Sequence, residues 1–584
     1  MAIKTLLVYP EIPPTYWSLK YALPFIGKRA VFPPLGLMTV GAMLPGEFDV
    51  TLVDMNVEAL QESAVAGADL IMTSSMIVQK DSLEKVIGLC KKHGKTIVAG
   101  GPYPTSMNAQ IPGVDHFVLN EAEVTLPAFL EDFRNGKAKL LYSDTAKPDL
   151  ALTPAPRFDL IRKGRYSTMA LQYSRGCPHN CEFCDIIEMF GRVPRTKTPS
   201  QFMQEMDLLY EEGWRGSLFV VDDNFIGNRR EVKKLLPEIA AWQQKRNYPF
   251  NLFTEATLVL AEDEPLMDQM VLAGFNMVFV GIETPDRETL AVTGKTQNLK
   301  ADMLQSVRSI QAKGMEVSAG FILGFDGDKD DIFDRQIRFI QDAAIPTAMV
   351  GILTALPNTQ LYRRLDAQGR ITQDSVGGNT HDLRLNFVPT MDLDRLFAGY
   401  KRVLATIYKP DRYFDRCLKL LKNTRKHRTS ARRVGGTELR AFTLSLLLQT
   451  FSSYSWSYWK FMIRGFLAKP SMLAETVTMA VKGHHFFKMT QRFLDLEKFK
   501  CSLDSVVRSF PKKAEGLSVS DLKPKVAELE AYRDRVLAEM RARYRKIHKD
   551  FRVYADDALA NFNATMDDLI AKIAAQSTAP SRSF

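Results

Sequence analysis

The stretch Arg175-Gly-Cys-Pro-His-Asn-Cys-Glu-Phe-Cys184 places Cys177, Cys181 and Cys184 in one short loop, with the spacing C-x3-C-x2-C. A structural zinc site or a cubane iron–sulfur cluster usually takes four protein ligands. The other three cysteines stand isolated in the sequence, and they are Cys90, Cys417 and Cys501. Three thiols without a fourth therefore favour an iron–sulfur cluster with one iron left open for a small molecule. A zinc loop completed by a distant residue is the alternative.

The residues around this loop, about 156–370, alternate short apolar runs with helical patterns. Six runs predict strands: 168–173, 217–221, 250–254, 277–280, 317–322 and 348–353. Repeated strand–helix units predict a partial parallel (β/α)6 barrel, whose ligand loops follow the carboxyl ends of the strands. Polar and glycine residues stand at those ends, namely Asp222, Asp223, Asn224, Glu255, Glu283, Gly320 and Gly324. Glu255 is equally well explained as an ordinary strand end.

Residues 1–155 show a second α/β pattern. Strands are expected at 4–9, 50–54, 70–73, 96–99 and 116–119, with helices between them. This pattern is typical of a doubly wound parallel sheet, which binds ligands at the carboxyl ends of its strands. The loops at those ends hold Asp54, Asn56, Glu58, Ser74, Ser75, Gly100 and Gly101. A Rossmann-like domain with a different ligand, or with none, is the alternative.

Residues 371–584 lack a strand pattern and are expected to be mostly helical. A basic run contains Arg416, Lys419, Lys422, Arg425, Lys426, Arg428, Arg432, Arg433 and Arg440. It is followed by the uncharged segment 441–459, which includes Tyr454, Trp456, Tyr458 and Trp459. Peripheral contact with a membrane surface is one interpretation, and a buried helix pair with a solvated basic face is the other. Nucleic acid is not expected as a partner, because the aromatic residues follow the basic run rather than interleave with it.

The composition sets broader limits. The chain has 584 residues, a formal net charge of +10 and six cysteines without a pairing pattern. This length predicts more than one domain. The cysteine usage favours a reducing, cytoplasmic setting. If the membrane interpretation holds, we expect the protein to lie peripherally at the inner face of the cell membrane. The first ten residues have too short an apolar run for a signal peptide and predict a strand.

The cysteine loop resembles the signature of the radical S-adenosylmethionine (SAM) enzymes. The resemblance implies that a 4Fe-4S cluster on the three cysteines binds SAM at its open iron and cleaves it to a 5′-deoxyadenosyl radical. It further implies which residues hold SAM: Phe183 against the adenine, Asp222, Asp223 and Asn224 at the amino group, Glu283 at the ribose hydroxyls, and Gly320 and Gly324 where the backbone approaches the adenine.

The N-terminal region resembles the cobalamin-binding domain of vitamin B12 enzymes. Members that place a histidine on cobalt read Asp-x-His-x-x-Gly after the second strand. Here Asp54 is followed by Asn56 at the histidine position and by Ala59 at the glycine position. This departure argues against histidine ligation but not against the domain. The resemblance implies that the seven loop residues named above contact cobalamin.

The two regions together resemble the cobalamin-dependent, class B radical SAM methyltransferases. The resemblance implies that cob(I)alamin takes a methyl group from one SAM and that a second SAM yields the radical. The substrate radical then takes the methyl group from methylcobalamin. A reductant such as flavodoxin or ferredoxin is implied as a partner.

Motifs such as Phe32-Pro-Pro-Leu-Gly36 and Ala355-Leu-Pro-Asn-Thr359 resemble two kinds of member, the hopanoid C-2 methylases and the bacteriochlorophyllide methyltransferases. Both act on large apolar substrates. A chlorin is the favoured prediction, since the aromatic residues of 454–459 would stack on a macrocycle and His484 or His485 would bind its magnesium. A tetrapyrrole cyclase that transfers no methyl group and a non-catalytic carrier remain as alternatives. An RNA methylthiotransferase is disfavoured, because residues 1–155 hold one cysteine where that class needs three.

Overall fold

The computed structural model describes residues 2–375, 377, 383–425, 435–509 and 519–578. The chain divides into two compact units, residues 1–486 and residues 487–584. The predicted domain boundaries near residues 155 and 370 stay predictions.

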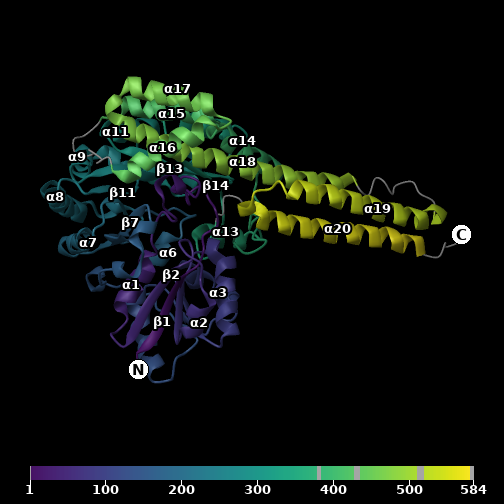
Figure 1. Cartoon of the computed structure of the whole chain (residues 1–584), viewed down its shortest axis with the longest axis horizontal. Helices are drawn as coiled ribbons and strands as arrows, with labels where there is room; N and C mark the ends of the chain where they lie inside the picture. Colours follow the sequence, from purple (N-terminus) through teal and green to yellow (C-terminus); the bar gives the residue numbers. More distant parts are fainter. Residues whose placement is uncertain (1, 376, 378–382, 426–434, 510–518, 579–584) are drawn as a thin grey trace. The chain divides into compact units, whose positions relative to one another are not determined.

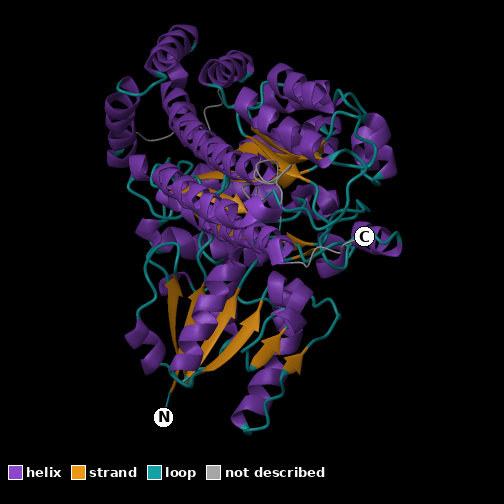
Figure 2. Cartoon of the chain, turned by 90° about the vertical axis from the view of Figure 1, so that its right-hand side faces the viewer, coloured by secondary structure: helices purple, strands orange, loops and turns teal. Residues whose placement is uncertain are grey.

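A six-stranded parallel sheet forms the N-terminal part of the first unit, and Figure 2 shows its strands running in one direction. The strand order is β2-β1-β3-β4-β5-β6. The strands are β1 (Ile3–Tyr9), β2 (Phe48–Asp54), β3 (Leu70–Ser74), β4 (Thr96–Gly100), β5 (His116–Val118) and β6 (Leu141–Tyr142). The helices between them are α1 (Leu35–Met43), α2 (Glu62–Gly67), α3 (Lys80–Lys92), α4 (Pro102–Met107) and α5 (Ala122–Arg134). Five strands match the predicted ones, and only the two-residue β6 was not predicted.

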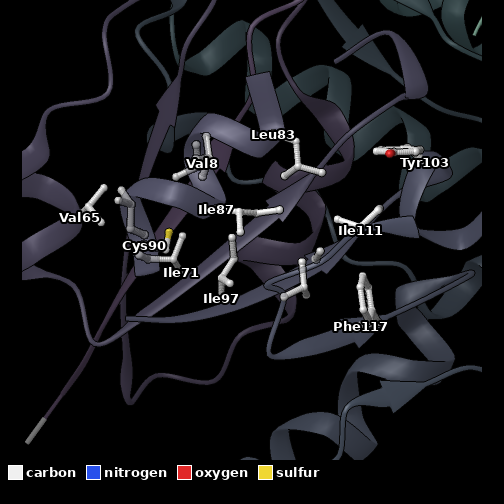
Figure 3. Packing of buried hydrophobic residues seen from close by; sticks show 14 of the residues in the cluster. Val8, Val65, Ile71, Leu83, Ile87, Cys90, Ile97, Tyr103, Ile111 and Phe117 are labelled. Carbon is white, nitrogen blue, oxygen red and sulfur yellow. The ribbon is translucent and has the colours of Figure 1, made fainter. Parts of the chain in front are cut away.

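The residues of this sheet pack on both of its faces. On β1, Leu6 and Val8 belong to the core beneath α3, while Leu7 belongs to the core on the other face. Figure 3 shows the first core, in which Val8 and Ile71 gather with Leu83 and Ile87 of α3. Alternate residues of a strand point to opposite faces, so the continuous apolar run of β1 requires a sheet covered on both sides.

A second six-stranded parallel sheet has the order β14-β13-β12-β11-β10-β7. Its strands are β7 (Thr168–Leu171), β10 (Gly216–Val220), β11 (Phe250–Ala256), β12 (Phe275–Glu283), β13 (Glu316–Leu323) and β14 (Ala348–Ile352). Short strands β8 (Ser174–Arg175) and β9 (Arg195–Thr196) pair beside the cysteine loop. The helices are α6 (Ile186–Phe190), α7 (Pro199–Glu211), α8 (Arg229–Lys245), α9 (Glu264–Leu272), α10 (Arg287–Val292), α11 (Met303–Ala312), α12 (Ile332–Asp342) and α13 (Gln360–Ala367). Since β7 and β14 are not paired with each other, the barrel is partial, as predicted.

From Leu393 onward the described residues are mostly helical. Its helices are α14 (Leu393–Ile407), α15 (Pro410–Asn423), α16 (Gly436–Thr450), α17 (Ser455–Ala468), α18 (Leu473–Ser509), α19 (Val519–Tyr544) and α20 (Arg552–Thr578). Helices α15 and α17 lie side by side (Figure 1). Within the described residues, no helix combines the length and the apolar composition that a membrane crossing requires.

The predicted basic face is wrong at Arg416, which is fully buried. Its guanidinium donates to the carbonyls of Ile345 at 2.8 Å and Ile407 at 2.5 Å and to Gln341 Oε1 at 2.6 Å. A buried guanidinium needs such acceptors, and residues distant in sequence supply them. Lys419, Lys422, Arg425 and Arg440 are exposed, whereas Lys426, Arg428, Arg432 and Arg433 lie outside the described residues.

The aromatic segment also splits between interior and surface. Tyr454 and Tyr458 are buried, and Trp456 is 81% exposed. The four aromatic side chains of 454–459 therefore do not form one stacking surface.

Candidate active site

The cysteine loop joins β8 to α6 and closes tightly on itself. Gly176 has a φ of 95°, and a Cβ at this position would lie 2.8 Å from the carbonyl oxygen of Gly191. The Cys177 amide donates to that same oxygen at 3.2 Å. Glycine is therefore required where the loop turns toward its first cysteine.

Two side-chain amides point at the cysteine sulfurs. Asn224 Nδ2 donates to Cys177 Sγ at 3.8 Å, and Gln297 Nε2 donates to Cys181 Sγ at 3.5 Å. Hydrogen bonds to ligand sulfurs stabilise a reduced iron–sulfur cluster. Burial raises the pKa of Cys177 and of Cys184, so a metal is needed to hold these groups as thiolates.

Within the described residues, no three His, Cys, Asp or Glu side chains converge on the position of a single metal ion. A cubane cluster does not need this convergence, because each cysteine binds a different iron. The loop, its three thiols and its two amide donors thus fit a 4Fe-4S cluster.

Residues distant in sequence also hold the cysteine loop through hydrogen bonds to Glu182. The Glu182 carboxylate accepts two hydrogen bonds from Arg364, from Nε at 3.0 Å and from Nη2 at 2.8 Å. The Glu182 amide donates to Thr293 at 3.0 Å, and its carbonyl accepts from Leu361 at 2.8 Å. The sequence interpretation missed Gln297 and Arg364, since neither stands in a recognisable motif.

The acidic turn after β10 accepts hydrogen bonds from the residues that lead into the cysteine loop. The Asp222 carboxylate is fully buried and accepts from the Tyr173 amide at 2.7 Å and from the Ser174 amide and hydroxyl at 2.8 and 2.6 Å. Asp223 accepts from the Gly176 amide at 3.2 Å. Burial raises the pKa of Asp222 to about 6 and that of Asp223 to about 7. Both oxygens of Asp222 thus accept hydrogen bonds from the residues that enter the cysteine loop, whereas Asp223 bonds Gly176 and Asn224 bonds Cys177 within it.

Glu283 ends β12 beside a buried lysine. Glu283 Oε1 lies 2.8 Å from Lys295 Nζ, and both side chains are about one-tenth exposed. Burial lowers the pKa of Lys295, but the negative charges of the Glu283 carboxylate and of a Cys181 thiolate raise it by more, so the lysine stays charged. A Cβ at Gly320 would lie 4.0 Å from Glu283 Oε2, so the two predicted SAM residues are neighbours.

Phe183 and Gly324 flank the same region. The Phe183 ring lies 5.6 Å from the Phe325 ring and 6.0 Å from Lys295 Nζ. Gly324 has a φ of 97°, and its amide donates to Asp328 at 2.8 Å. Glu255 is the last residue but one of β11. Burial, and after it the charges of Asp223, Asp222 and Glu283, raise its pKa to about 8. The structure thus brings the predicted SAM residues to one edge of the partial barrel.

At the edge of the N-terminal sheet, Asp54 and Asn56 form one network. Asp54 accepts from the Asn56 amide at 2.9 Å and from Asn56 Nδ2 at 2.7 Å, and from the Tyr166 hydroxyl at 2.8 Å. Asn56 Oδ1 accepts from the Ile12 amide at 2.8 Å. Asn56 therefore joins the loop after β1 to the loop after β2 through hydrogen bonds. Glu58 lies in the same loop, with Oε2 3.2 Å from Arg162 Nη1.

The remaining predicted cobalamin residues pack against one another. A Cβ on Gly101, whose φ is 88°, would lie 2.3 Å from Ser74 Oγ, and one on Gly100 would lie 2.7 Å from the carbonyl oxygen of Val118. The hydroxyls of Thr73 and Ser75 are buried without a hydrogen-bond partner among the described residues. Buried hydroxyls at a strand end fit a polar ligand that supplies the missing partner, and so these residues fit a bound cobalamin.

A buried charge cluster connects the carboxyl edges of the two sheets. Arg175, which begins the cysteine stretch, donates to Glu121 at 2.8 Å and to Glu123 at 2.9 Å, and Arg195 donates to Glu121 at 2.8 Å. Both glutamates follow β5 of the N-terminal sheet, and their side chains are at most 5% exposed. The loop that begins the cluster site is therefore held against the edge of the N-terminal sheet.

This fold and site define a radical SAM enzyme with a cobalamin-binding domain. Residues 29–130 match the B12 binding domain, residues 171–340 the Radical SAM superfamily, and residues 359–498 a domain of unknown function. The chain belongs to the cobalamin-dependent radical SAM methyltransferases. Enzymes of this family use a 4Fe-4S cluster, SAM and cobalamin, and they depend on a reductant.

Two long matches carry this assignment. The chain is 40% identical to an uncharacterized methyltransferase of Synechocystis sp. over 83% of this chain and 92% of the relative. It is 30% identical to the hopanoid C-2 methylase of Rhodopseudomonas palustris over 82% of this chain and 92% of the relative. The bacteriochlorophyllide d C-8(2)-methyltransferase of Chlorobaculum tepidum is 23% identical over 58% and 76% of the two chains.

Among solved structures, the cobalamin-dependent SAM radical enzyme OxsB, with aqua-cobalamin and SAM bound, has the same fold. The TM-score is 0.55 at 15% identity, covering 97% of this chain and 84% of that one.

Proposed function

We propose that this enzyme transfers a methyl group to an unactivated carbon of a large apolar polycyclic substrate, and that the substrate is a pentacyclic triterpenoid. The observation that carries the proposal is the buried contact of Arg175 with Glu121 and Glu123. It holds the cysteine loop against the carboxyl edge of the N-terminal sheet, where we place cobalamin. A radical formed on one side and a methyl donor on the other must reach the same substrate carbon. This contact favours such an arrangement.

We assign the residues accordingly. Cys177, Cys181 and Cys184 hold the cluster. Phe183, Asp223, Asn224, Glu283, Gly320 and Gly324 contact SAM, and Asp222 positions the cluster loop rather than touching SAM. Asp54, Asn56, Glu58, Ser74, Ser75, Gly100 and Gly101 line the cobalamin side. When bound, the three cofactors supply the electron, the radical and the methyl group, and the chain holds them and excludes water.

The substrate assignment departs from the chlorin prediction, which rested on two features. The first was the aromatic stack, and Tyr454 and Tyr458 are buried within the helices. The second was His484 or His485 as a ligand for magnesium, and His484 Nδ1 lies 2.5 Å from the Tyr454 hydroxyl oxygen. His485 is fully buried, and its Nδ1 accepts from the Tyr21 amide at 3.3 Å while its Nε2 lies 3.2 Å from the Tyr16 carbonyl oxygen. A carbonyl only accepts, so both ring nitrogens are engaged. The greater similarity to the hopanoid methylase also supports a triterpenoid.

Anaerobic reconstitution tests the activity. The enzyme is supplied with iron, sulfide, hydroxocobalamin, a reduced flavodoxin and SAM carrying a labelled methyl group, and is given diploptene or bacteriochlorophyllide. We expect labelled, methylated diploptene together with 5′-deoxyadenosine. Cys184→Ala should abolish both products, whereas Cys501→Ala, at an exposed cysteine outside the loop, should not. Methylation of bacteriochlorophyllide alone would reject the triterpenoid.

Two other functions have distinct outcomes in the same assay. A tetrapyrrole cyclase would consume SAM without moving the label into product. A cofactor carrier would form no 5′-deoxyadenosine. Either result would contradict methyl transfer.

We also infer peripheral contact with the inner face of the cell membrane. Large apolar side chains are exposed on α16, α17 and the turn between them, and the most exposed are Phe451 at 87% and Trp456 at 81%. Exposed cations Lys460 and Arg464 lie on the same helix as Trp456. Aromatic and cationic side chains together are typical of a surface that meets anionic lipid. Flotation with anionic liposomes should carry the wild type and lose the Phe451→Ser, Trp456→Ser variant.

A further inference from the structure

Three phenylalanines stand on adjacent strands of the radical SAM sheet, Phe219 on β10, Phe253 on β11 and Phe279 on β12. The residues on either side of each are fully buried, and these are Leu218, Val220, Leu252, Thr254, Val278 and Val280. The three phenylalanines are only partly buried. Since alternate residues of a strand point to opposite faces, the three rings lie on the inner face, away from the covering helices.

Two aromatic residues from the N-terminal region complete this surface. Phe32 lies 5.1 Å from Phe219 between ring centroids, and Trp17 lies 5.0 Å from Phe279. Phe219 and Phe253 are stacked at 4.7 Å with an interplanar angle of 6°. We call Trp17, Phe32, Phe219, Phe253 and Phe279 the aromatic face.

The aromatic face continues directly into the SAM side of the site. A Cβ on Gly320 would lie 3.2 Å from Phe279 Cζ and 4.0 Å from Glu283 Oε2. Glu255 is the register partner of Phe279 between β11 and β12. A molecule that lies on Phe279 therefore adjoins Gly320 and Glu283, which are assigned to SAM.

Trp17 stays 47% exposed although the residue before it is fully buried. The Tyr16 ring packs on Tyr408 at 5.3 Å and Phe486 at 6.3 Å. The Tyr16 carbonyl accepts from His485, as described above. The C-terminal helices thus fix the backbone beside Trp17 while its own ring keeps a large area that a ligand can cover.

We propose that the aromatic face is the substrate-binding surface and that a rigid, apolar, polycyclic hydrocarbon lies on it with its reacting carbon at the Phe279–Gly320 end. This inference rests on the proposed function, whose substrate it locates. Covering aromatic rings with a saturated polycycle removes apolar area on both molecules from water, and no polar partner is needed. Trp17 and Phe253 are then specificity-determining residues, and His485 is a positioning residue for Trp17.

A binding experiment tests the surface without turnover. The chain has five tryptophans, of which Trp214 and Trp242 are buried, so the Trp456→Phe, Trp459→Phe variant keeps Trp17 as its exposed tryptophan. We expect dilute diploptene to shift the emission of this variant to shorter wavelength and to leave unchanged the variant that also carries Trp17→Phe. A shift that is absent from the double variant, or that persists when Trp17→Phe is added to it, overturns the proposal.

A turnover experiment separates this proposal from the proposed function. Trp17→Ala and Phe253→Ala should lower methylated diploptene at least tenfold while 5′-deoxyadenosine formation stays within threefold of wild type. Leu272→Ala, at an exposed apolar residue of α9, is the control and should change neither. His485→Ala should act like Trp17→Ala, and His485→Gln should restore part of the methylation. If the wild type forms no 5′-deoxyadenosine, the proposed function fails. If the wild type methylates diploptene, and the Trp17→Ala and Phe253→Ala variants do so at the same rate, the proposed function holds and the proposed binding surface is wrong.

Discussion

Glu283 and Lys295 form a buried ion pair of 2.8 Å at the end of β12, twelve residues apart in sequence. Glu283 has a φ of 63°, in the left-handed region that non-glycine residues seldom adopt, and the β12–β13 register shifts at this point. Such strain persists only where surrounding contacts over-determine it. The surrounding contacts therefore hold this pair in place at the end of β12, where we propose that SAM binds.

Gly281→Ala should disturb this pair. A Cβ there would lie 2.2 Å from Glu283 Oε1 and 2.7 Å from Lys295 Nζ. We expect a loss of about 1–3 kcal/mol in unfolding free energy, typical of overpacking, and SAM binding weakened at least tenfold. Urea unfolding and equilibrium dialysis with SAM measure the two effects. Gly351→Ala on β14 is the control, because a Cβ there meets nothing within 4 Å. Equal behaviour of the two variants would show that the pair does not hold SAM.

Asp222→Asn should damage the entry to the cysteine loop. One oxygen would become an NH2 group facing N–H and O–H donors from Tyr173 and Ser174, which costs about 1–3 kcal/mol for the unmade bonds. Less iron and sulfide should be incorporated on reconstitution. Asp223→Asn keeps an acceptor for Gly176, so we expect near-normal cluster content with weaker SAM binding. If Asp222→Asn instead loses only SAM affinity, its assignment as a positioning residue is wrong.

Arg175→Met should weaken the contact between the cysteine loop and the carboxyl edge of the N-terminal sheet. It would leave the carboxylates of Glu121 and Glu123 buried with one partner fewer, and breaking a buried pair costs about 3–5 kcal/mol. Thermal unfolding and cobalamin retention on gel filtration check this. Arg157→Met removes an exposed pair with Asp159 and should cost less than about 1 kcal/mol. Similar losses in both variants would argue against a special role for the buried cluster.

Glu255→Gln should alter the pH dependence of stability. Burial raises the pKa of Glu255 from its usual value of 4.5 to about 8, so the folded protein binds this proton more tightly than the unfolded chain. Stability is then lost as pH rises from about 4.5 to about 8, and the loss is constant above that range. The variant lacks this loss and should gain stability over wild type across the same range. Urea midpoints of the cofactor-free protein at pH 5 and pH 8.5 measure it. A constant difference between variant and wild type would show that Glu255 does not titrate there.

Most strands could be predicted from the sequence. A parallel strand covered on both faces reads as a continuous apolar run, as in Leu6-Leu7-Val8, and its ends follow from the polar loops. The cysteine loop was equally clear, since three thiols at this spacing in one short loop are typical of few kinds of metal site. The positions of Glu283, Gly320 and Asp54 toward the carboxyl ends of their strands could also be predicted, and loops after parallel strands meet at one edge of a sheet.

The partners of these residues were not predictable. Lys295, Gln297, Arg364 and Glu121 look like ordinary surface residues in sequence, and their contacts join positions up to 182 residues apart. Arg416 was placed on a basic face because its neighbours are basic, yet its carbonyl acceptors bury it. Charge patterns describe composition along a chain, whereas burial depends on which acceptors the fold brings near.

The sequence by itself determined the order of the two α/β regions, the three-thiol loop and the family, because strand periodicity and ligand spacing are local properties. Only the tertiary structure decided that Arg175 docks the cluster loop on Glu121 and Glu123, and that Trp17 meets Phe279. Those contacts depend on strand register and on packing between distant segments, and no local pattern encodes either one.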